Sequence, residues 1–559
     1  MKSATPVDYC FILIFYLSIT LLNLVWVNEV ACAYQYIDYC KILVWPFFAS
    51  FIFMFLGVIT GKRMISICIF FCYIIFIEAN LIYLRTFDSW IPLGSYSEVF
   101  NIFDFLDAVI YNIKIQDLLI ISSTIILIVI VNRLKFKKIQ FHISAWVNFL
   151  VLIILGIVTV AILNSPTSIK GQITINSKQH NSHPMSAAYF SIPVVLAYDY
   201  LQIEQITPGS IKIAKAALSH RLEKDSIQSD FKNLIFIFME SLESWALKAK
   251  VGEKEVAPVL NHLINDKNNL CCTDIISETG SGRSIDAQLI TLCGLLPPKD
   301  EIFCFKYTGT EYPSIYHAFK QTSNFAVHYY STDLPSTYNM EKFHSKLGID
   351  STHFFSSRKI NRTRIQDADL MDKVIADIEN NNLWHKDKSN VFQILTYSCH
   401  TPYKTFSEAD MPIKEKLPKN ANNYLKLVHY TDSAVGIFMN YLSKKADFDK
   451  TLVVIASDHP TFSIWERKYI AEIFPDANKS HIPVIIVNGN KSQNYSLSER
   501  CHYQSDIYPT LILLLNLYDY NWHGVGYPLM DNTACNEENK ISASKLIIQH
   551  NLYKKQHTF

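Results

Sequence analysis

Apolar residues follow two different patterns along this chain. The first 165 residues contain five long apolar runs with few charges, at residues 9–27, 41–60, 64–84, 117–131 and 146–163. A helix needs about 20 apolar residues to cross the hydrocarbon core of a bilayer. A cleaved signal peptide would account for the first run only. The pattern therefore predicts a five-helix transmembrane domain over residues 1–165.

Basic residues between these runs predict the orientation of the chain. Lys62 and Arg63 separate the second and third runs, and the segment 133–138 (RLKFKK) follows the fourth, whereas residues 28–40 contain no Lys or Arg. Basic loops stay on the cytoplasmic side of a membrane. We therefore expect a multi-pass protein of the inner or plasma membrane, with everything after residue 165 on the extracytoplasmic side.

The rest of the chain alternates short apolar runs with helical patterns. The predicted strands are 233–239, 325–330, 391–397, 451–457 and 482–488, and the predicted helices between or after them are 256–265, 314–321, 367–379, 423–444 and 505–517. This alternation is typical of an α/β domain with a mostly parallel sheet covered on both faces. We expect this domain to span residues 229–559, after a polar connector at residues 166–228.

Charge and cysteine content narrow the possible functions. The net charge is +1, and no basic stripe with interleaved aromatic residues is present, so we expect no nucleic-acid partner. The chain has 12 cysteines but no Cys-x-x-Cys pair. Cys293 and Cys304 flank a proline-containing loop and form a candidate disulfide, although spacing alone does not establish pairing.

Ionisable residues stand at the ends of several predicted strands. Glu240 follows the first strand, His400 follows the third, Asp458 and His459 follow the fourth, and His481 precedes the fifth. In parallel sheets, ligand sites form just beyond the carboxyl ends of the strands. Carboxylate oxygens and imidazole nitrogens are ligands that suit Zn²⁺ or Mn²⁺. The pattern predicts a site for a divalent metal at this edge.

A glycine-rich segment, SETGSGRSIDAQL at residues 277–289, places Arg283 and Ser284 at the start of a predicted helix. A helix N-terminus beside a cation is suited to bind phosphate. A metal bound to the Ser284 hydroxyl would lower its pKa and make it a nucleophile.

Each of these residues also has a simpler interpretation. Ser284 is a common type of N-cap residue, and Glu240 and Asp458 could each stabilise the start of a neighbouring helix or loop. His400 could be an ordinary loop histidine. The convergence of several such residues at one edge favours a functional site.

Six segments together resemble a known family. They are NLIFIFMESLESW, GSGRSIDAQLITLCGLLP, SCHTPY, LKLVHYTDSAVGIFMNYL, VVIASDH and YQSDIYPTLILLLNLY, in this order. The order is similar to that in lipoteichoic acid synthases and periplasmic phosphoglycerol transferases, which belong to the sulfatase and alkaline phosphatase superfamily. Each motif is weak alone, but the ordered set is specific, and the five-run N-terminal part is also similar.

The resemblance implies roles for individual residues. Glu240, Ser284, Asp458 and His459 match the metal ligands of the family, with Ser284 also as the nucleophile. His400 resembles the histidine that contacts the substrate phosphate or leaving group.

Two positions depart from the family pattern. Ser284 replaces the usual threonine and can perform the same chemistry. The segment 337–340 (TYNM) replaces a Phe-Trp-Asn-Arg motif that binds glycerol phosphate, which leaves the head group open. Arg283, His400, Tyr338 and His481 are the candidate substrate-binding residues, and His481 resembles a histidine of the phosphoethanolamine transferases.

We therefore expect a transferase that moves a phosphoglycerol head group from a membrane phospholipid to a glycan, polymer or lipid acceptor through a covalent Ser284 intermediate. The expected cofactor is Mn²⁺ or Zn²⁺. A phosphoethanolamine transferase, a phosphate or sulfate ester hydrolase, and an inactive scaffold with the same fold remain alternatives.

Overall fold

The computed structural model describes parts of the N-terminal region and most of the chain after residue 208. The N-terminal parts are 6–30, 63–87 and 112–133, with short pieces between 42 and 53 and a few other residues before 208, and the larger gaps after 208 are 224–229, 299–301, 357–364, 492–494 and 533–536. The chain divides into two compact units. The first consists mainly of Met1–Ile203, and the second mainly of Glu204–Phe462 and Glu466–Phe559.

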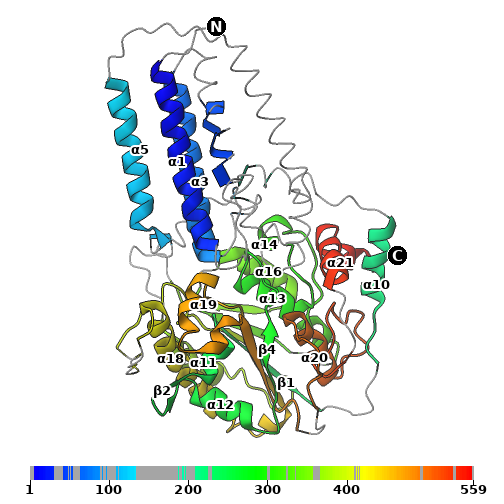
Figure 1. Cartoon of the computed structure of the whole chain (residues 1–559). Coiled ribbons are helices and arrows are strands. Elements are labelled where there is room, and N and C mark those ends of the chain that lie inside the picture. Colours follow the sequence, from blue (N-terminus) through cyan, green and yellow to red (C-terminus); the bar gives the residue numbers. More distant parts are fainter. Residues whose placement is uncertain are drawn as a thin grey trace. The chain divides into compact units, whose positions relative to one another are not determined.

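The first unit contains three long helices among its described residues: α1 (Pro6–Val30), α3 (Arg63–Phe87) and α5 (Ile115–Arg133) (Figure 1). They cover the first, third and fourth predicted runs. Cys10–Glu29 and Met64–Arg85 are long and apolar enough to cross a membrane, and Ile115–Val131 is shorter. Only part of the second run is described, all of it helical, and the fifth run lies outside the described residues. Five spans therefore remain a prediction.

The second unit contains a seven-stranded sheet in the order β4-β9-β8-β1-β7-β5-β6. The strands are β1 (Asn233–Met239), β4 (Leu270–Ile276), β5 (Val327–Ser331), β6 (Ser351–Phe354), β7 (Val391–Leu395), β8 (Thr451–Ser457) and β9 (His481–Val487). All neighbours from β8 to β6 pair in parallel, whereas β9 pairs antiparallel with both β8 and β4. The predicted mostly parallel sheet is thus confirmed.

Alternate residues of the central strand β1 enter two separate hydrophobic cores, one on each face of the sheet. The helices that contribute to the first core are α10 (Pro208–Ser219), α13 (Ser284–Cys293), α14 (Phe303–Lys306), α15 (Ile315–Lys320), α16 (Met340–Leu347), α20 (Ile507–Leu514), α21 (Glu537–Gln549) and α22 (Leu552–Gln556). Those of the second are α11 (Ser244–Lys248), α12 (Pro258–Asn265), α17 (Asp367–Asn380), α18 (Lys419–Leu442) and α19 (Ile464–Ile470). Figure 1 shows these helices around the sheet.

Some elements differ from the sequence predictions. Strands β4 and β6 and a short hairpin of β2 (Lys250–Val251) and β3 (Lys254–Glu255) were not predicted. The candidate disulfide is wrong, because Cys293 and Cys304 are both buried in the first core and are not joined by a disulfide.

The reversed direction of β9 brings one more residue to the functional edge of the sheet. His481 is its first residue and pairs with Ile276, the last residue of β4. The start of β9 therefore lies beside the carboxyl end of β4, from which the chain continues into the glycine-rich segment before α13.

Candidate active site

Three ionisable side chains meet where two adjacent strands end. Glu240 follows β1, and Asp458 and His459 follow β8, which pairs in register with β1 along seven residues. The three residues are buried, with exposures of 3%, 0% and 7%. One ligand atom of each lies within 4.8 Å of the others. The structure thus brings together three of the four residues predicted as metal ligands.

Ser284, the fourth predicted ligand, lies against this cluster. It is the first residue of α13, and its Oγ is 3.3 Å from Glu240 Oε2 and 3.4 Å from His459 Nε2. The N-cap position belongs to Arg283, and no side chain caps the helix. The simpler interpretation of Ser284 as an N-cap is therefore wrong.

Hydrogen bonds orient two of the ligands. His459 Nδ1 is 2.9 Å from the carbonyl oxygen of Pro460, which can only accept, so Nδ1 carries a proton and Nε2 faces the cluster. Asp458 Oδ1 accepts from the backbone N–H groups of Ser241 and His459, both at 2.7 Å. Asp458 Oδ2 is buried without a hydrogen-bond partner. This orphaned oxygen is available to a cation.

The distances between the donor atoms fit a tetrahedral metal ion. Ligands at about 2.0–2.1 Å from Zn²⁺ lie roughly 3.3–3.4 Å from one another. The two Ser284 distances are 3.3 and 3.4 Å, and His459 Nε2 is 3.5 Å from Asp458 Oδ2 and 3.6 Å from Glu240 Oε1. Most of these distances are too long for a strong hydrogen bond. They match the edges of a coordination shell.

Electrostatics of the cluster also favour a cation. Burial raises the pKa of Glu240 well above its usual value, and the charge of Asp458 raises it further. Burial lowers the pKa of His459. Two buried carboxylates beside each other are costly unless a positive charge compensates them. A divalent metal ion would provide that compensation.

The glycine-rich segment is folded around a buried carboxylate that sequence reasoning did not single out. Asp286 Oδ2 accepts from the backbone N–H groups of Gly280 and Gly282, both at 2.9 Å. A Cβ at Gly282 would stand only 2.3 Å from Asp286 Oδ1, so this position requires glycine. Arg283 follows with a positive φ of 47°, a conformation that is strained for a residue with a side chain. Asp286 therefore fixes the turn that presents Ser284.

Two further buried side chains hold the ligand-bearing segments. Glu243 pairs with Arg467 at 2.6 Å, and its Oε1 accepts from the backbone N–H groups of Thr461 and Phe462, just after His459. Gln504 donates through Nε2 to the backbone oxygen of Asp458 at 2.8 Å. Gln504 gave no signal in the sequence, because its contact depends on the tertiary fold.

Arg283 and His400 lie on segments that border the cluster. Arg283 Nη1 donates to the backbone oxygen of Pro460 at 3.1 Å. His400 follows β7 on a loop fixed by Asp367, which accepts from the backbone N–H of Tyr397 at 2.8 Å. The His400 ring stacks on Tyr397 at 4.6 Å.

Tyr338 and His481 have no described contact with the four predicted metal ligands. Tyr338 lies in a 3₁₀ turn with a positive φ of 50°, and its ring is 6.3 Å from that of Phe305. His481 begins β9 and interacts with Asp274. Substrate binding by these two residues remains a prediction.

Comparison with known families gives one family match. A family model described as "Sulfatase" matches residues 232–517, which is just over half of the 559 residues. The match begins one residue before β1 and ends just after α20, so it covers the sheet and the four clustered residues.

Curated relatives and a solved structure are similar to the chain. Lipoteichoic acid synthase 2 of Bacillus subtilis is 23% identical over 60% of this chain and 51% of its own length. Lipoteichoic acid synthase of Staphylococcus aureus is 24% identical over 52% and 46%. The chain therefore spans about half the length of these relatives. An integral membrane phosphoethanolamine transferase of Neisseria meningitidis shares the fold, with a TM-score of 0.51 and 14% identity over 97% of this chain and 99% of its own.

Proposed function

Because the chain belongs to the sulfatase family, we propose that it is a membrane-anchored, metal-dependent transferase. It moves a phosphoglycerol head group from a phospholipid to an acceptor hydroxyl on a glycan, a polymer or another lipid. The similarity to lipoteichoic acid synthases supports this class of reaction. Catalysis takes place on the extracytoplasmic side, and the N-terminal helices hold the enzyme at the membrane that contains its donor.

The observation that carries this proposal is the position of Ser284 Oγ, 3.3 Å from Glu240 Oε2 and 3.4 Å from His459 Nε2. The fold does not require a serine hydroxyl beside two ionisable side chains, so this position indicates a chemical role for Ser284. It is placed at the N-terminus of α13, where backbone N–H groups favour a phosphate.

Glu240, Asp458, His459 and Ser284 would hold the metal, and their oxygen and nitrogen atoms suit either Zn²⁺ or Mn²⁺. When bound, the metal supplies positive charge that lowers the pKa of the Ser284 hydroxyl and offsets the charge of the phosphate. The chain itself contributes Arg283 and the helix N-terminus to the stabilisation of phosphate oxygens.

The reaction proceeds in two displacements. In the first, Ser284 Oγ, which has already lost its proton to solvent, forms a bond to phosphorus, the bond from phosphorus to the diacylglycerol oxygen breaks, and that oxygen takes a proton. His400 is the proposed proton donor. In the second, the acceptor oxygen bonds to phosphorus, the bond to Ser284 Oγ breaks, and the acceptor proton returns to His400. The result is a phosphoglyceryl acceptor and the free enzyme.

The head group is tested by comparing two donors. Full-length protein in detergent is given phosphatidylglycerol or phosphatidylethanolamine together with Zn²⁺ or Mn²⁺, and diacylglycerol release is measured. We expect faster release from phosphatidylglycerol, and loss of release in Glu240→Gln. Faster release from phosphatidylethanolamine would instead assign a phosphoethanolamine transferase. No release from either lipid by metal-loaded protein would refute the proposal.

A further inference from the structure

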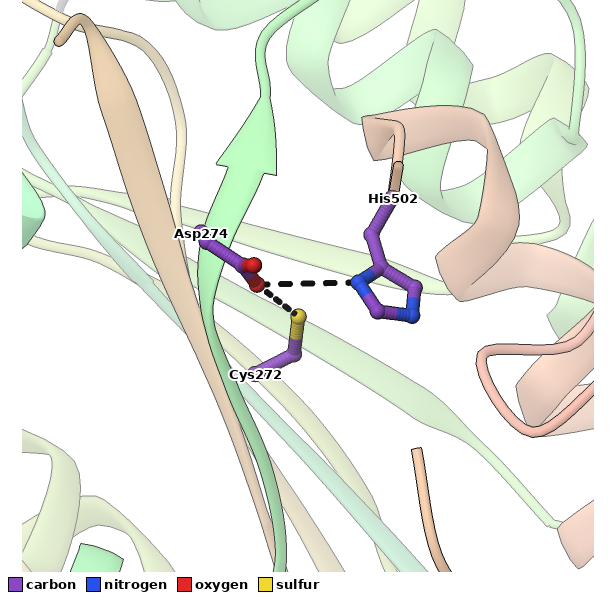
Figure 2. Close-up of side chains that lie close together, drawn as sticks. All are labelled: Cys272, Asp274 and His502. Atoms are coloured by element: carbon purple, nitrogen blue, oxygen red, sulfur yellow. Dashed lines mark hydrogen bonds and ion pairs between the residues drawn. The ribbon is translucent and has the colours of Figure 1, made fainter. Parts of the chain in front are cut away.

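A second group of metal-ligand side chains lies on strand β4. Cys272 and Asp274 belong to this strand, and His502 lies on the segment before α20. Figure 2 shows dashed lines from the Asp274 carboxylate to each of the other two side chains. Cys272 Sγ is 2.9 Å from Asp274 Oδ1, and His502 Nδ1 is 3.6 Å from the same oxygen. None of these residues has a role in the proposed phosphotransfer.

The ring of His502 points an unsatisfied nitrogen at this group. His502 is 3% exposed, and its Nδ1 is buried without a hydrogen-bond partner. Its other nitrogen, Nε2, is 3.1 Å from Ser498 Oγ. Histidines that bind metals commonly use the second ring nitrogen to donate to a neighbouring oxygen, which fixes the ring. Ser498 in turn donates its backbone N–H to Leu529.

When His502 donates its Nε2 proton to Ser498 Oγ, its Nδ1 presents a lone pair toward the Asp274 carboxylate. Two electron-rich atoms that face each other at 3.6 Å repel unless a positive charge lies between them. The Cys272 thiol donates to the same carboxylate and does not supply that charge. Nitrogen, oxygen and sulfur atoms thus converge from three sides.

We propose that Cys272, Asp274 and His502 form a second metal site, which binds Zn²⁺. A thiolate with an imidazole selects Zn²⁺ over Mg²⁺, Ca²⁺ or Mn²⁺, which prefer oxygen ligands. The site differs from the Glu240 cluster, which contains no sulfur atom.

The geometry requires only a small adjustment. Zn²⁺ with ligands at about 2.0–2.3 Å places nitrogen and oxygen roughly 3.4 Å apart and sulfur and oxygen roughly 3.5 Å apart. The nitrogen–oxygen distance of 3.6 Å fits, and the sulfur–oxygen distance of 2.9 Å must lengthen. Asp274 can move, because its side chain is 64% exposed. On binding, the Sγ–H bond breaks, its proton goes to solvent, and Sγ bonds to the metal.

The role of this ion is structural. The backbone N–H of Ile276 donates to the backbone oxygen of His502 at 2.9 Å, so β4 already touches this segment. Two residues later, Gln504 contacts the backbone oxygen of Asp458. A metal bound between β4 and His502 would therefore stabilise the segment that contains Gln504, which contacts the backbone of Asp458.

Cobalt substitution tests the site through a signal that the active site lacks. Full-length protein in detergent is stripped of metal and titrated with Co²⁺, and the near-ultraviolet charge-transfer absorption from thiolate to cobalt is recorded. We expect this absorption in the wild type and in Cys271→Ser, whose side chain belongs to the opposite core. We expect its loss in Cys272→Ser.

Because Cys272 is buried, its substitution could unfold the protein. A second variant at an exposed ligand therefore separates loss of metal binding from misfolding. Asp274→Asn changes an exposed side chain, and we expect the cobalt midpoint to rise by about 10–100-fold or more. His502→Gln should remove one equivalent of Zn²⁺ and leave the equivalent at Glu240, whereas Asp458→Asn should do the reverse. The two sites are therefore tested separately, and a lack of phosphotransfer activity would not change the result expected for the Cys272 site. An absent absorption, or one that survives Cys272→Ser in folded protein, would overturn the proposal.

Discussion

At the scale of single residues, the site depends on a few buried side chains that hold backbone segments in place. The Asp286 carboxylate accepts hydrogen bonds from two backbone N–H groups of the glycine-rich turn, and Arg283, with its strained backbone, follows that turn directly. The position of Ser284 is therefore set by Asp286, which has no part in the proposed substrate binding. An error of about 1 Å in such a position can lower a rate by about 100-fold.

Gly282→Ala tests this positioning. The new Cβ would collide with the Asp286 carboxylate at 2.3 Å and displace the turn. We expect kcat/KM for diacylglycerol release to fall by about 100-fold, with little change in Tm. Gly309→Ala is the matched control, since nothing lies within 4 Å of its Cβ position. Equal activities of the two variants would contradict the role of Asp286.

The residues at strand ends could be predicted from the sequence, because a strand and the residue after it are local features. Glu240, Asp458 and His459 follow buried runs that match β1 and β8. The sequence could not predict the contributions of Glu243, Asp286 and Gln504. Each of these side chains contacts backbone groups that are distant in sequence or belong to an irregular turn.

At the scale of elements, the predictions succeeded where a strand is buried on both faces. β1 and β8 have their predicted bounds, and β5, β7 and β9 differ by a few residues. β4 (LCCTDII) was missed because cysteines, Thr273 and the exposed Asp274 interrupt its apolar pattern at a bulge. β6 was missed because it is a short, half-buried edge strand. The direction of β9 depends on its partners and has no local signal.

Helix α12 shows how one element stabilises another. It begins at Pro258 and has no capping side chain of its own. Asp432 of α18 instead accepts from the backbone N–H groups of Val259 and Leu260, at 3.0 and 2.8 Å. Burial raises the pKa of Asp432 to about 6, although these backbone hydrogen bonds oppose the shift.

This shift predicts a pH dependence of stability. Between about pH 4 and pH 6 the folded state keeps the Asp432 proton and the unfolded state loses it, so stability falls as pH rises and is level above pH 6. The total is about 3 kcal/mol at roughly 1.4 kcal/mol per pKa unit. The free energy of unfolding of the wild type, minus that of Asp432→Asn, should fall over this range in urea titrations. A difference that stays level or rises over this range would contradict the raised pKa of Asp432. Asp372→Asn, at an exposed position of α17, is the control.

At the scale of the whole molecule, a unit with apolar helices is joined to a sulfatase-family unit. This combination suits an enzyme whose donor is a membrane lipid. The proposed function requires the second unit to lie on the extracytoplasmic side of the membrane.

Labelling of Cys501 tests this orientation. Cys501 is an exposed thiol of the second unit. A maleimide that cannot cross membranes should label it in intact cells, as found by peptide mapping, and Cys501→Ser should lack that labelled peptide. Labelling of Cys501 only after the cells are permeabilised would place the unit on the cytoplasmic side.

In the proposed reaction, Ser284 carries the phosphoglycerol group as a covalent intermediate. The most direct measurement is peptide mass spectrometry of metal-loaded protein, quenched in acid during turnover of phosphatidylglycerol, with diacylglycerol measured in the same samples. We expect a glycerol-phosphate adduct on Ser284 in the wild type, and neither adduct nor diacylglycerol with Ser284→Ala. Undiminished diacylglycerol release by Ser284→Ala would contradict it.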